Sequence, residues 1–274
     1  MPPAAAPPYI LWRMVRPLLL LLLAAWVATP ATAGAPFEAL APGGEAVVAE
    51  IVDGDTVVLS DGRQVRLVGI QAPKLPLGRP DFAPWPLADR AKAALADIAL
   101  GRTVGLGFGG RRMDRHGRWL AHLFAPGGLW VQGELLTQGL ARVYSFADNR
   151  ALAAEMLALE GAARDAGRGI WADPFYRVRV PEEADAETDS FQLVEGRIVS
   201  AAVVRGRGYL NFGPDWRNDF TLAIDPQSRR LFEAEGRAVE SYEGLRVRAR
   251  GWLKSFNGPM IEITHPEQIE VLSE

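Results

Sequence analysis

Cysteine is absent from this 274-residue chain, and histidine occurs only three times, at His116, His122 and His265. Without cysteine the chain has no disulfide scaffold, zinc finger, iron–sulfur centre, cysteine nucleophile or lipoprotein anchor. With only three histidines in the chain, a metal site built from several histidines is not expected. A strong excess of one charge is also absent, since 30 basic residues face 33 acidic residues. Any binding of nucleic acid or anionic lipid therefore has to come from a local patch.

The N-terminus has the layout of a secretory signal peptide. Arg13 and Arg16 precede an apolar run, and the small residues at 31–33 offer a cleavage site after it. The run of about a dozen apolar residues is shorter than the roughly 20 that a membrane-spanning helix needs, so cleavage is favoured over an uncleaved anchor. We expect a signal peptide at 1–33, export to the periplasm or the medium, and no stable membrane insertion after cleavage. A flexible lead-in is expected at 34–44.

The rest of the chain is expected to form two domains, because about 150 residues is a usual domain size and 49% of the residues are apolar. Strand-like runs dominate and a few helical patterns lie between them, which predicts an α+β fold that is mainly β. The first domain is expected at 45–176 and an acidic linker at 177–190. Short strands recur around one short helix at 191–274, which predicts a small OB-like β-barrel.

In the first domain, residues 45–70 read as three strands separated by two Asp-Gly pairs, the strongest short-range hairpin signal. If the loop at Asp61-Gly62 has two residues, Arg66 lies opposite Val57 and Asp55 is its diagonal neighbour on the same face. A carboxylate and a guanidinium would then meet on one patch of sheet. Taken alone, such a pair is more often an ordinary surface ion pair. Helices are predicted at 87–100, at 131–138 and from about 150 to 167, and strands at 103–108 and 119–124.

The segment at 111–118, RRMDRHGR, holds four arginines and lies beside a turn that contains glycine. A guanidinium binds a phosphate diester in a bidentate manner, which a lysine ammonium does not. The alternative is a solvated turn without a ligand.

Several motifs follow one another in a fixed order: VDGDT, RLVGI followed by A-P, a helix, DRHGRWLA, QGLARVY and GIW. In this order and spacing they resemble the staphylococcal nuclease (thermonuclease-like) family over about residues 45–172. The resemblance implies a five-stranded OB-type barrel with packed helices. It also implies calcium-dependent hydrolysis of phosphodiester bonds in DNA or RNA.

The resemblance assigns roles to particular residues. Asp55 matches the calcium-binding aspartate, Arg66 the arginine that clamps the phosphate, and Arg118 the arginine that stabilises the transition state and the leaving oxygen. Arg115 and Tyr144 are expected to bind substrate. Stabilisation of developing charge is usually the largest catalytic contribution, and a calcium ion would add Lewis acidity.

Two positions depart from the family pattern, which has an acidic metal ligand where this chain has Gln71 and a glutamate base where it has Lys74. The side-chain oxygen of Gln71 can still be a weak calcium ligand, but losing a carboxylate weakens the binding of a hard cation. Losing a general base typically lowers the rate by about 10²–10⁴. We therefore expect a pocket that binds phosphate and repels calcium, with the Lys74 ammonium in the calcium position and paired with Asp55. Replacement of the base by Asp81 is a weaker alternative, and the sequence does not place Asp89 either.

In the second domain, aromatic residues alternate with basic residues. Stacking aromatics beside cations are how OB-folds hold single strands. The favoured alternative is that the aromatics fill the barrel and the arginines solvate its surface, because the domain is acidic overall. His265, which precedes a proline, is expected to be a turn residue and not a ligand. The residues of the pattern are Tyr209, Phe212, Trp216, Phe220, Trp252 and Phe256, with Arg205, Arg207, Arg217, Arg248, Arg250 and Lys254.

Together these features predict an exported, thermonuclease-like protein that acts on nucleic-acid phosphodiesters. The competing hypothesis is a catalytically inactive nuclease-fold module that binds nucleic acid or another phosphate-bearing ligand. A third is an interaction protein of the cell envelope.

Overall fold

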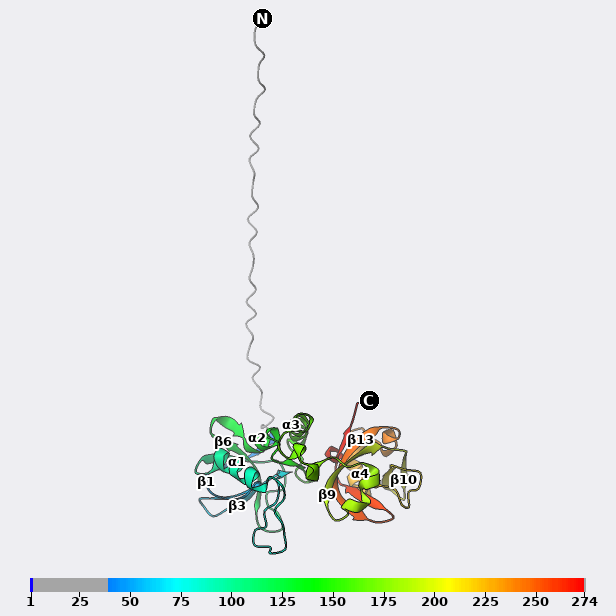
Figure 1. The fold of residues 1–274 in the computed structure, drawn as a ribbon, viewed down its shortest axis with the longest axis horizontal. Helices are drawn as coiled ribbons and strands as arrows, with labels where there is room; N and C mark the ends of the chain where they lie inside the picture. Colours follow the sequence, from blue (N-terminus) through cyan, green and yellow to red (C-terminus); the bar gives the residue numbers. More distant parts are fainter. Residues whose placement is uncertain (2–38, 274) are drawn as a thin grey trace. The chain divides into compact units, whose positions relative to one another are not determined.

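The computed structural model describes residue 1 and residues 39–273 (Figure 1). The predicted signal peptide, after residue 1, and the lead-in up to residue 38 lie outside the described residues. The first strand, β1, covers Ala41–Asp53, so the last residues of the predicted lead-in belong to a strand. None of the helices in the described part has the length and hydrophobicity that crossing a membrane requires.

Five strands of the N-terminal part close into a barrel. The order of pairing is β3-β2-β1-β5-β6-β7, and β3 also pairs in parallel with β6, which closes the ring. The α+β class and the five-stranded barrel of this part are thus confirmed. The strands are β1, β2 (Thr56–Leu59), β3 (Gln64–Leu67), β5 (Thr103–Phe108) and β6 (Trp119–Ala125), with the short β7 (Leu129–Trp130) at the edge.

The hairpin between β2 and β3 differs by one residue from the predicted register. Arg66 lies opposite Thr56, not opposite Val57. The reason is the turn: Leu59 donates its N–H to the carbonyl of Arg63 at 2.8 Å, which encloses three residues. The last of them, Gly62, has a φ of 84°, the left-handed conformation that three-residue hairpin loops require.

Three helices and a small second sheet complete the N-terminal part. The helices are α1 (Ala88–Ala99), α2 (Val131–Thr137) and α3 (Ala153–Asp165), all within the segments predicted to be helical. The second sheet pairs β4 (Gly69–Gln71) with β8 (Arg142–Tyr144). Gly54, in the turn after β1, packs so closely on α1 that an added Cβ would lie 2.8 Å from the Cβ of Ala91. This contact fixes the turn that carries Asp55.

The C-terminal part has a core of its own and one sheet in the order β10-β11-β12-β14-β13-β15, with β9 also paired to β13. Strand β12 pairs in parallel with β14. These pairings do not by themselves close the sheet, so the OB-like barrel of this part stays a prediction. Its elements are β9 (Phe191–Arg197), β10 (Ser200–Val204), β11 (Arg207–Asn211), β12 (Thr221–Ile224), α4 (Pro226–Ala234), β13 (Arg246–Ser255), β14 (Pro259–Ile263) and β15 (Ile269–Val271).

The acidic segment between the two cores consists of short 3-10 turns. Ala184 between two of them is fully buried in the second core, and Arg179 pairs with Glu187 at 2.7 Å. The segment expected to be a linker is therefore packed. The 3-10 turns of the chain are η2 (Pro126–Gly128), η3 (Gly169–Ala172), η4 (Pro174–Tyr176), η5 (Pro181–Glu183), η6 (Asp185–Glu187), η7 (Val239–Tyr242) and η8 (Pro266–Gln268).

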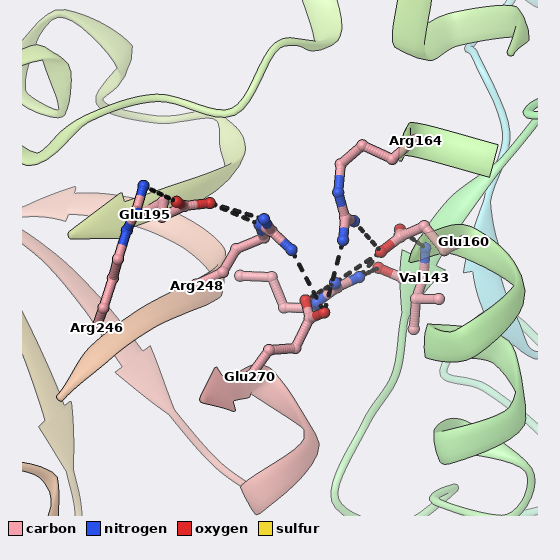
Figure 2. A network of polar contacts seen from close by, with 8 residues as sticks. Val143, Glu160, Arg164, Glu195, Arg246, Arg248 and Glu270 are labelled. Atoms are coloured by element: carbon pink, nitrogen blue, oxygen red, sulfur yellow. Dashed lines mark hydrogen bonds and ion pairs between the residues drawn. The ribbon is translucent and has the colours of Figure 1, made fainter. Parts of the chain in front are cut away.

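A buried ion-pair network joins α3 to β13 (Figure 2). Arg250 of β13 is 1% exposed and donates to both carboxylate oxygens of Glu160, at 3.0 and 2.7 Å. It also pairs with Glu270. Arg164 reaches the same Glu160 at 3.2 Å, and Glu160 accepts the N–H of Val143 at 2.7 Å. Arg250, expected on the solvated surface, is thus buried, because its partner comes from a segment about 90 residues earlier in the chain.

Candidate active site

A cavity of about 630 Å³ lies where β3, the loop after β4 and the arginine-rich turn at 111–118 meet. The predicted residues Arg66, Lys74, Arg115, Arg118 and Tyr144 all line it. Five residues of the wall are positively charged and three are negatively charged. The positive residues are Arg66, Lys74, Arg111, Arg115 and Arg118, and the negative residues are Asp53, Asp114 and Asp148. The wall therefore carries a surplus of positive charge, as a site for a phosphate requires.

Asp55 is fully buried beside this cavity and is held by two cations. The Arg66 guanidinium lies 2.9 Å from Oδ1, and the Lys74 ammonium lies 2.7 Å from Oδ2. The backbone N–H of Ala72 donates to Oδ2 at 2.7 Å as well. Burial alone would raise the pKa of Asp55, but Arg66 and Lys74 outweigh it and lower the pKa to about 2. The carboxylate is thus ionised and paired at neutral pH.

Arg66 is itself fixed by the loop that follows it. Its guanidinium donates to the carbonyl of Ile70 at 2.8 Å and to the carbonyl of Leu67 at 3.2 Å. The predicted meeting of Asp55 and Arg66 therefore occurs, although the hairpin register differs by one residue. These contacts hold the guanidinium in one orientation on the cavity wall.

Asp53 is a wall residue that the sequence did not single out. Its Oδ1 accepts the N–H of Asp55 at 3.1 Å, and its Oδ2 lies 3.9 Å from the Lys74 ammonium. Burial, and then the neighbouring Asp55 charge, raise the pKa of Asp53. The available sequence signal was the Asp53-Gly54 pair, which indicated a turn and not a site. Asp81 and Asp89 are exposed and neither lines the cavity.

The turn at 111–118 is built around Asp114. Its carboxylate accepts the N–H groups of His116 and Arg118 at 2.8 and 3.0 Å, and its Oδ2 pairs with the Arg118 guanidinium at 2.7 Å. Arg118 is thereby directed along the cavity wall, whereas Arg115 is exposed next to His116. The segment is a turn, as expected, and it brings both predicted arginines to the cavity.

Gln71 is not brought to the cavity. Its side-chain oxygen accepts two hydrogen bonds from the Arg142 guanidinium, at 2.9 and 2.7 Å. Arg142 is buried with its guanidinium 4.6 Å from the ring centre of Phe191, and burial lowers the pKa of Arg142 to about 10. The Gln71 oxygen is therefore engaged by the Arg142 guanidinium, and neither residue lines the cavity.

The donor set does not fit calcium. Calcium takes six to eight oxygen ligands and its affinity rises with their negative charge. Here both oxygens of Asp55 face cations or an N–H group, and the oxygen of Gln71 faces Arg142. The described residues contain no cluster of three or more His, Asp or Glu side chains that could hold a metal ion. The calcium-ligand roles that the resemblance implies for Asp55 and Gln71 do not match this geometry.

The aromatic residues of the C-terminal part divide into two groups. Phe212 and Phe220 are buried in the core, as the favoured interpretation predicts. Trp216, Trp252 and Phe256 are 51%, 48% and 68% exposed. Trp216 and Phe256 line a second, largely apolar cavity of about 360 Å³, whereas Trp252 contacts the N-terminal part. His265 begins η8, as a turn residue does, but it is fully buried and bonds Ser145 at 2.7 Å.

Comparisons of the sequence with known proteins identify the family of the N-terminal part. The model of the staphylococcal nuclease homologue family matches residues 64–173. An uncharacterized endonuclease of Escherichia coli O157:H7 is 33% identical over 129 residues, which cover 46% of this chain and 76% of that protein. The chain belongs to the staphylococcal nuclease homologue family. Protein ParB of Escherichia coli is 37% identical over 144 residues, which cover 46% of this chain and 72% of that protein. The family region ends before β9, so the C-terminal part lies beyond it.

Proposed function

We propose that this member of the staphylococcal nuclease homologue family binds nucleic acid at a backbone phosphate in the cavity described above. The observation that carries the proposal is the Lys74 ammonium, 2.7 Å from the buried Asp55 carboxylate and on the cavity wall. A fixed ammonium supplies positive charge where the family pattern has a carboxylate. Arg66 and Arg118 supply guanidinium groups that suit a phosphate diester. Arg115 and Tyr144 complete the proposed substrate contacts.

The test measures binding of a fluorescently labelled 12-nucleotide single strand by anisotropy, at low salt and in EDTA. The single variants Arg66→Met, Lys74→Met and Arg118→Met each remove one cavity cation. We expect each to weaken binding by about 10- to 100-fold, because a charge-assisted hydrogen bond contributes roughly 1.5–3 kcal/mol. Arg102→Met removes an exposed arginine outside the cavity wall and serves as the matched control, expected to stay within about 2-fold. Equal losses in all four variants would refute a site at the cavity.

Hydrolysis is the second candidate activity, and the position of Asp53 favours it. Asp53 lines the cavity and its raised pKa makes it a better proton acceptor than an ordinary carboxylate. In this step, Asp53 accepts a proton from a water molecule as the water oxygen attacks phosphorus. The bond from phosphorus to the leaving sugar oxygen breaks, and Arg118 stabilises the charge on that oxygen.

This second proposal predicts slow cleavage of plasmid DNA and of RNA that persists in EDTA. The variant Asp53→Asn should lose it while Asp81→Asn, at an exposed acid, should not. Cleavage that needs added calcium would contradict it and would favour the calcium-assisted reaction that the family resemblance implies. Binding without any cleavage would favour the inactive binding module.

The organisation of the chain is proposed along with the function. We propose export by a signal peptide at residues 1–33, a nuclease-like domain at 45–176, a connecting segment at 177–190 and an OB-like domain at 191–274. The layout of the N-terminal sequence supports export, and the two separate hydrophobic cores support the division. Strand β10 follows β9 directly in the chain, β9 pairs with β13, and β10 pairs with β11. If β9 and β10 act as one continuous strand, the sheet closes into a barrel, which supports the proposed OB-like domain. N-terminal sequencing of protein from the periplasm or medium tests the first point.

A further inference from the structure

Two aromatic residues of the C-terminal part clamp Tyr144, a wall residue of the cavity. The Trp252 indole N–H donates to the Tyr144 hydroxyl at 2.8 Å. Phe191 meets the Tyr144 ring edge to face, with ring centres 4.8 Å apart. Phe191 and Trp252 are directly opposite each other on β9 and β13. The clamp is therefore a single cross-strand pair, which is a rigid element.

The buried ion pair holds this clamp in place. Side chains alternate along a strand, so Arg250 and Trp252 lie on the same face of β13. Arg250 is buried against Glu160, whereas Trp252, two residues on, is 48% exposed. Strand β13 is thus anchored to the N-terminal part by the contact of Arg250 with Glu160. Two residues later, Trp252 is partly exposed to solvent and contacts Tyr144, which lines the cavity.

The Trp252 side chain is about half exposed to solvent, although its indole N–H already donates a hydrogen bond to Tyr144. Phe146, which lines the cavity, is 49% exposed and packs edge to face on the same Tyr144, with ring centres 4.9 Å apart. A half-exposed indole with a fixed orientation, next to a cationic cavity, is the arrangement that binds bases in single-strand binding proteins.

We infer that Trp252 is a nucleotide-binding residue, at which the C-terminal part stacks an unpaired base adjoining the phosphate in the cavity. The inference rests on the proposed function, because it needs the backbone to lie along Arg66 and Lys74. A base in a duplex has its faces covered by its neighbours, whereas a base in a single strand is free to stack on a ring. The site therefore prefers single-stranded nucleic acid over duplex.

The experiment compares a labelled 12-nucleotide single strand with the matching duplex, using the full chain and the variants Trp252→Ala and Trp252→Phe. We expect Trp252→Ala to weaken single-strand binding by about 10-fold, since stacking on one aromatic ring is worth roughly 1–3 kcal/mol. Duplex binding should change by less than about 2-fold. Trp252→Phe keeps a ring and should stay within about 3-fold of the parent protein. Thermal unfolding verifies that each variant is folded.

Trp216→Ala is the matched control, because Trp216 is exposed to a similar degree, at 51%, but lines the second cavity. An equal loss in Trp216→Ala, an equal loss for duplex, or no loss in Trp252→Ala would overturn the inference. An equal loss in Trp252→Phe and Trp252→Ala would also overturn it, because the indole N–H and not stacking would then be responsible. If Arg66→Met and Lys74→Met leave binding intact, the proposed function fails instead, whatever Trp252 does.

Discussion

Removing Arg250 should destabilise the whole molecule, because it leaves a buried carboxylate without its main partner. Arg250 is 1% exposed and Glu160 is not exposed at all. Breaking a buried ion pair by deleting one member costs about 3–5 kcal/mol, mostly as the penalty for the charge left behind. Arg164 remains 3.2 Å from Glu160, and the Val143 N–H still bonds it. We therefore expect Arg250→Met to lie at the low end of that range, about 3 kcal/mol.

Equilibrium unfolding in urea at pH 7 measures this loss. The control is Arg207→Met, which removes a pair of similar length, 3.0 Å, whose side chains are 32% and 39% exposed. Exposed pairs contribute about 0–1 kcal/mol, so this variant should change little. Adding Glu160→Gln to Arg250→Met removes the stranded charge and keeps an acceptor for Val143. The double variant should be more stable than Arg250→Met alone.

The same reasoning fixes the dependence on pH. Burial alone would raise the pKa of Glu160, but Arg250 and its other partners lower it below the ordinary value of 4.5. A carboxyl whose pKa falls on folding stabilises the protein fully above pH 4.5 and loses that effect as the pH falls further. The difference between the parent protein and Arg250→Met should therefore shrink in acid. If Arg250→Met were no less stable than Arg207→Met at pH 7, the network would not hold the two cores together.

Three further outcomes follow from the cavity and its turns. Asp55→Asn should cost about 2 kcal/mol at neutral pH by urea unfolding, given the pKa of about 2 for Asp55, and the cost should disappear as the pH falls from 3.8 toward 2. Gly54→Ala should lower the free energy of unfolding in urea by about 1–3 kcal/mol through overpacking, because the added Cβ would lie 2.7 Å from the Cβ of Ala72. Gly62→Ala has open space around the added Cβ but a φ of 84°, so it should lower the free energy of unfolding by about 1 kcal/mol through backbone strain. The double variant Gln71→Asp, Lys74→Glu should bind calcium only weakly in calorimetric titration, because the Arg142 guanidinium, which now bonds Gln71, would pair with the new carboxylate at position 71. Tight binding of one calcium ion per chain would contradict this expectation.

Local patterns were enough to predict most of the first barrel and the meeting of Asp55 with Arg66. Asp-Gly pairs mark the turns, and a hairpin brings neighbours together whether its loop has two or three residues. The pairing of Lys74 with Asp55, expected from the family resemblance and the change of charge at position 74, is present at 2.7 Å. What local patterns could not give was the register, because Gly62 adopts the left-handed conformation of a three-residue loop.

The contacts that escaped prediction all join segments far apart in the sequence. Arg250 was expected on the surface because the second domain is acidic overall, and only the folded chain brings Glu160 to it. Trp252 was expected to fill the barrel, but it is 48% exposed, and only the pairing of β9 with β13 places it on Tyr144.

Gln71 and Lys74, the two residues that depart from the acidic residues of the family pattern, have related physical explanations. The Arg142 guanidinium is buried among aromatic rings, where a charge is costly, and its pKa falls accordingly to about 10. A carboxylate at position 71 would pair with the Arg142 guanidinium and would therefore not be free to bind a metal ion. The neutral Gln71 accepts two hydrogen bonds from the same guanidinium without adding a charge. The Asp55 carboxylate is then balanced by the Arg66 guanidinium and the Lys74 ammonium, without an ion from solution. The positive charge of the cavity wall is thus supplied by the chain's own side chains, so under the proposed function the removal of Lys74 should weaken phosphate binding whether or not calcium is present.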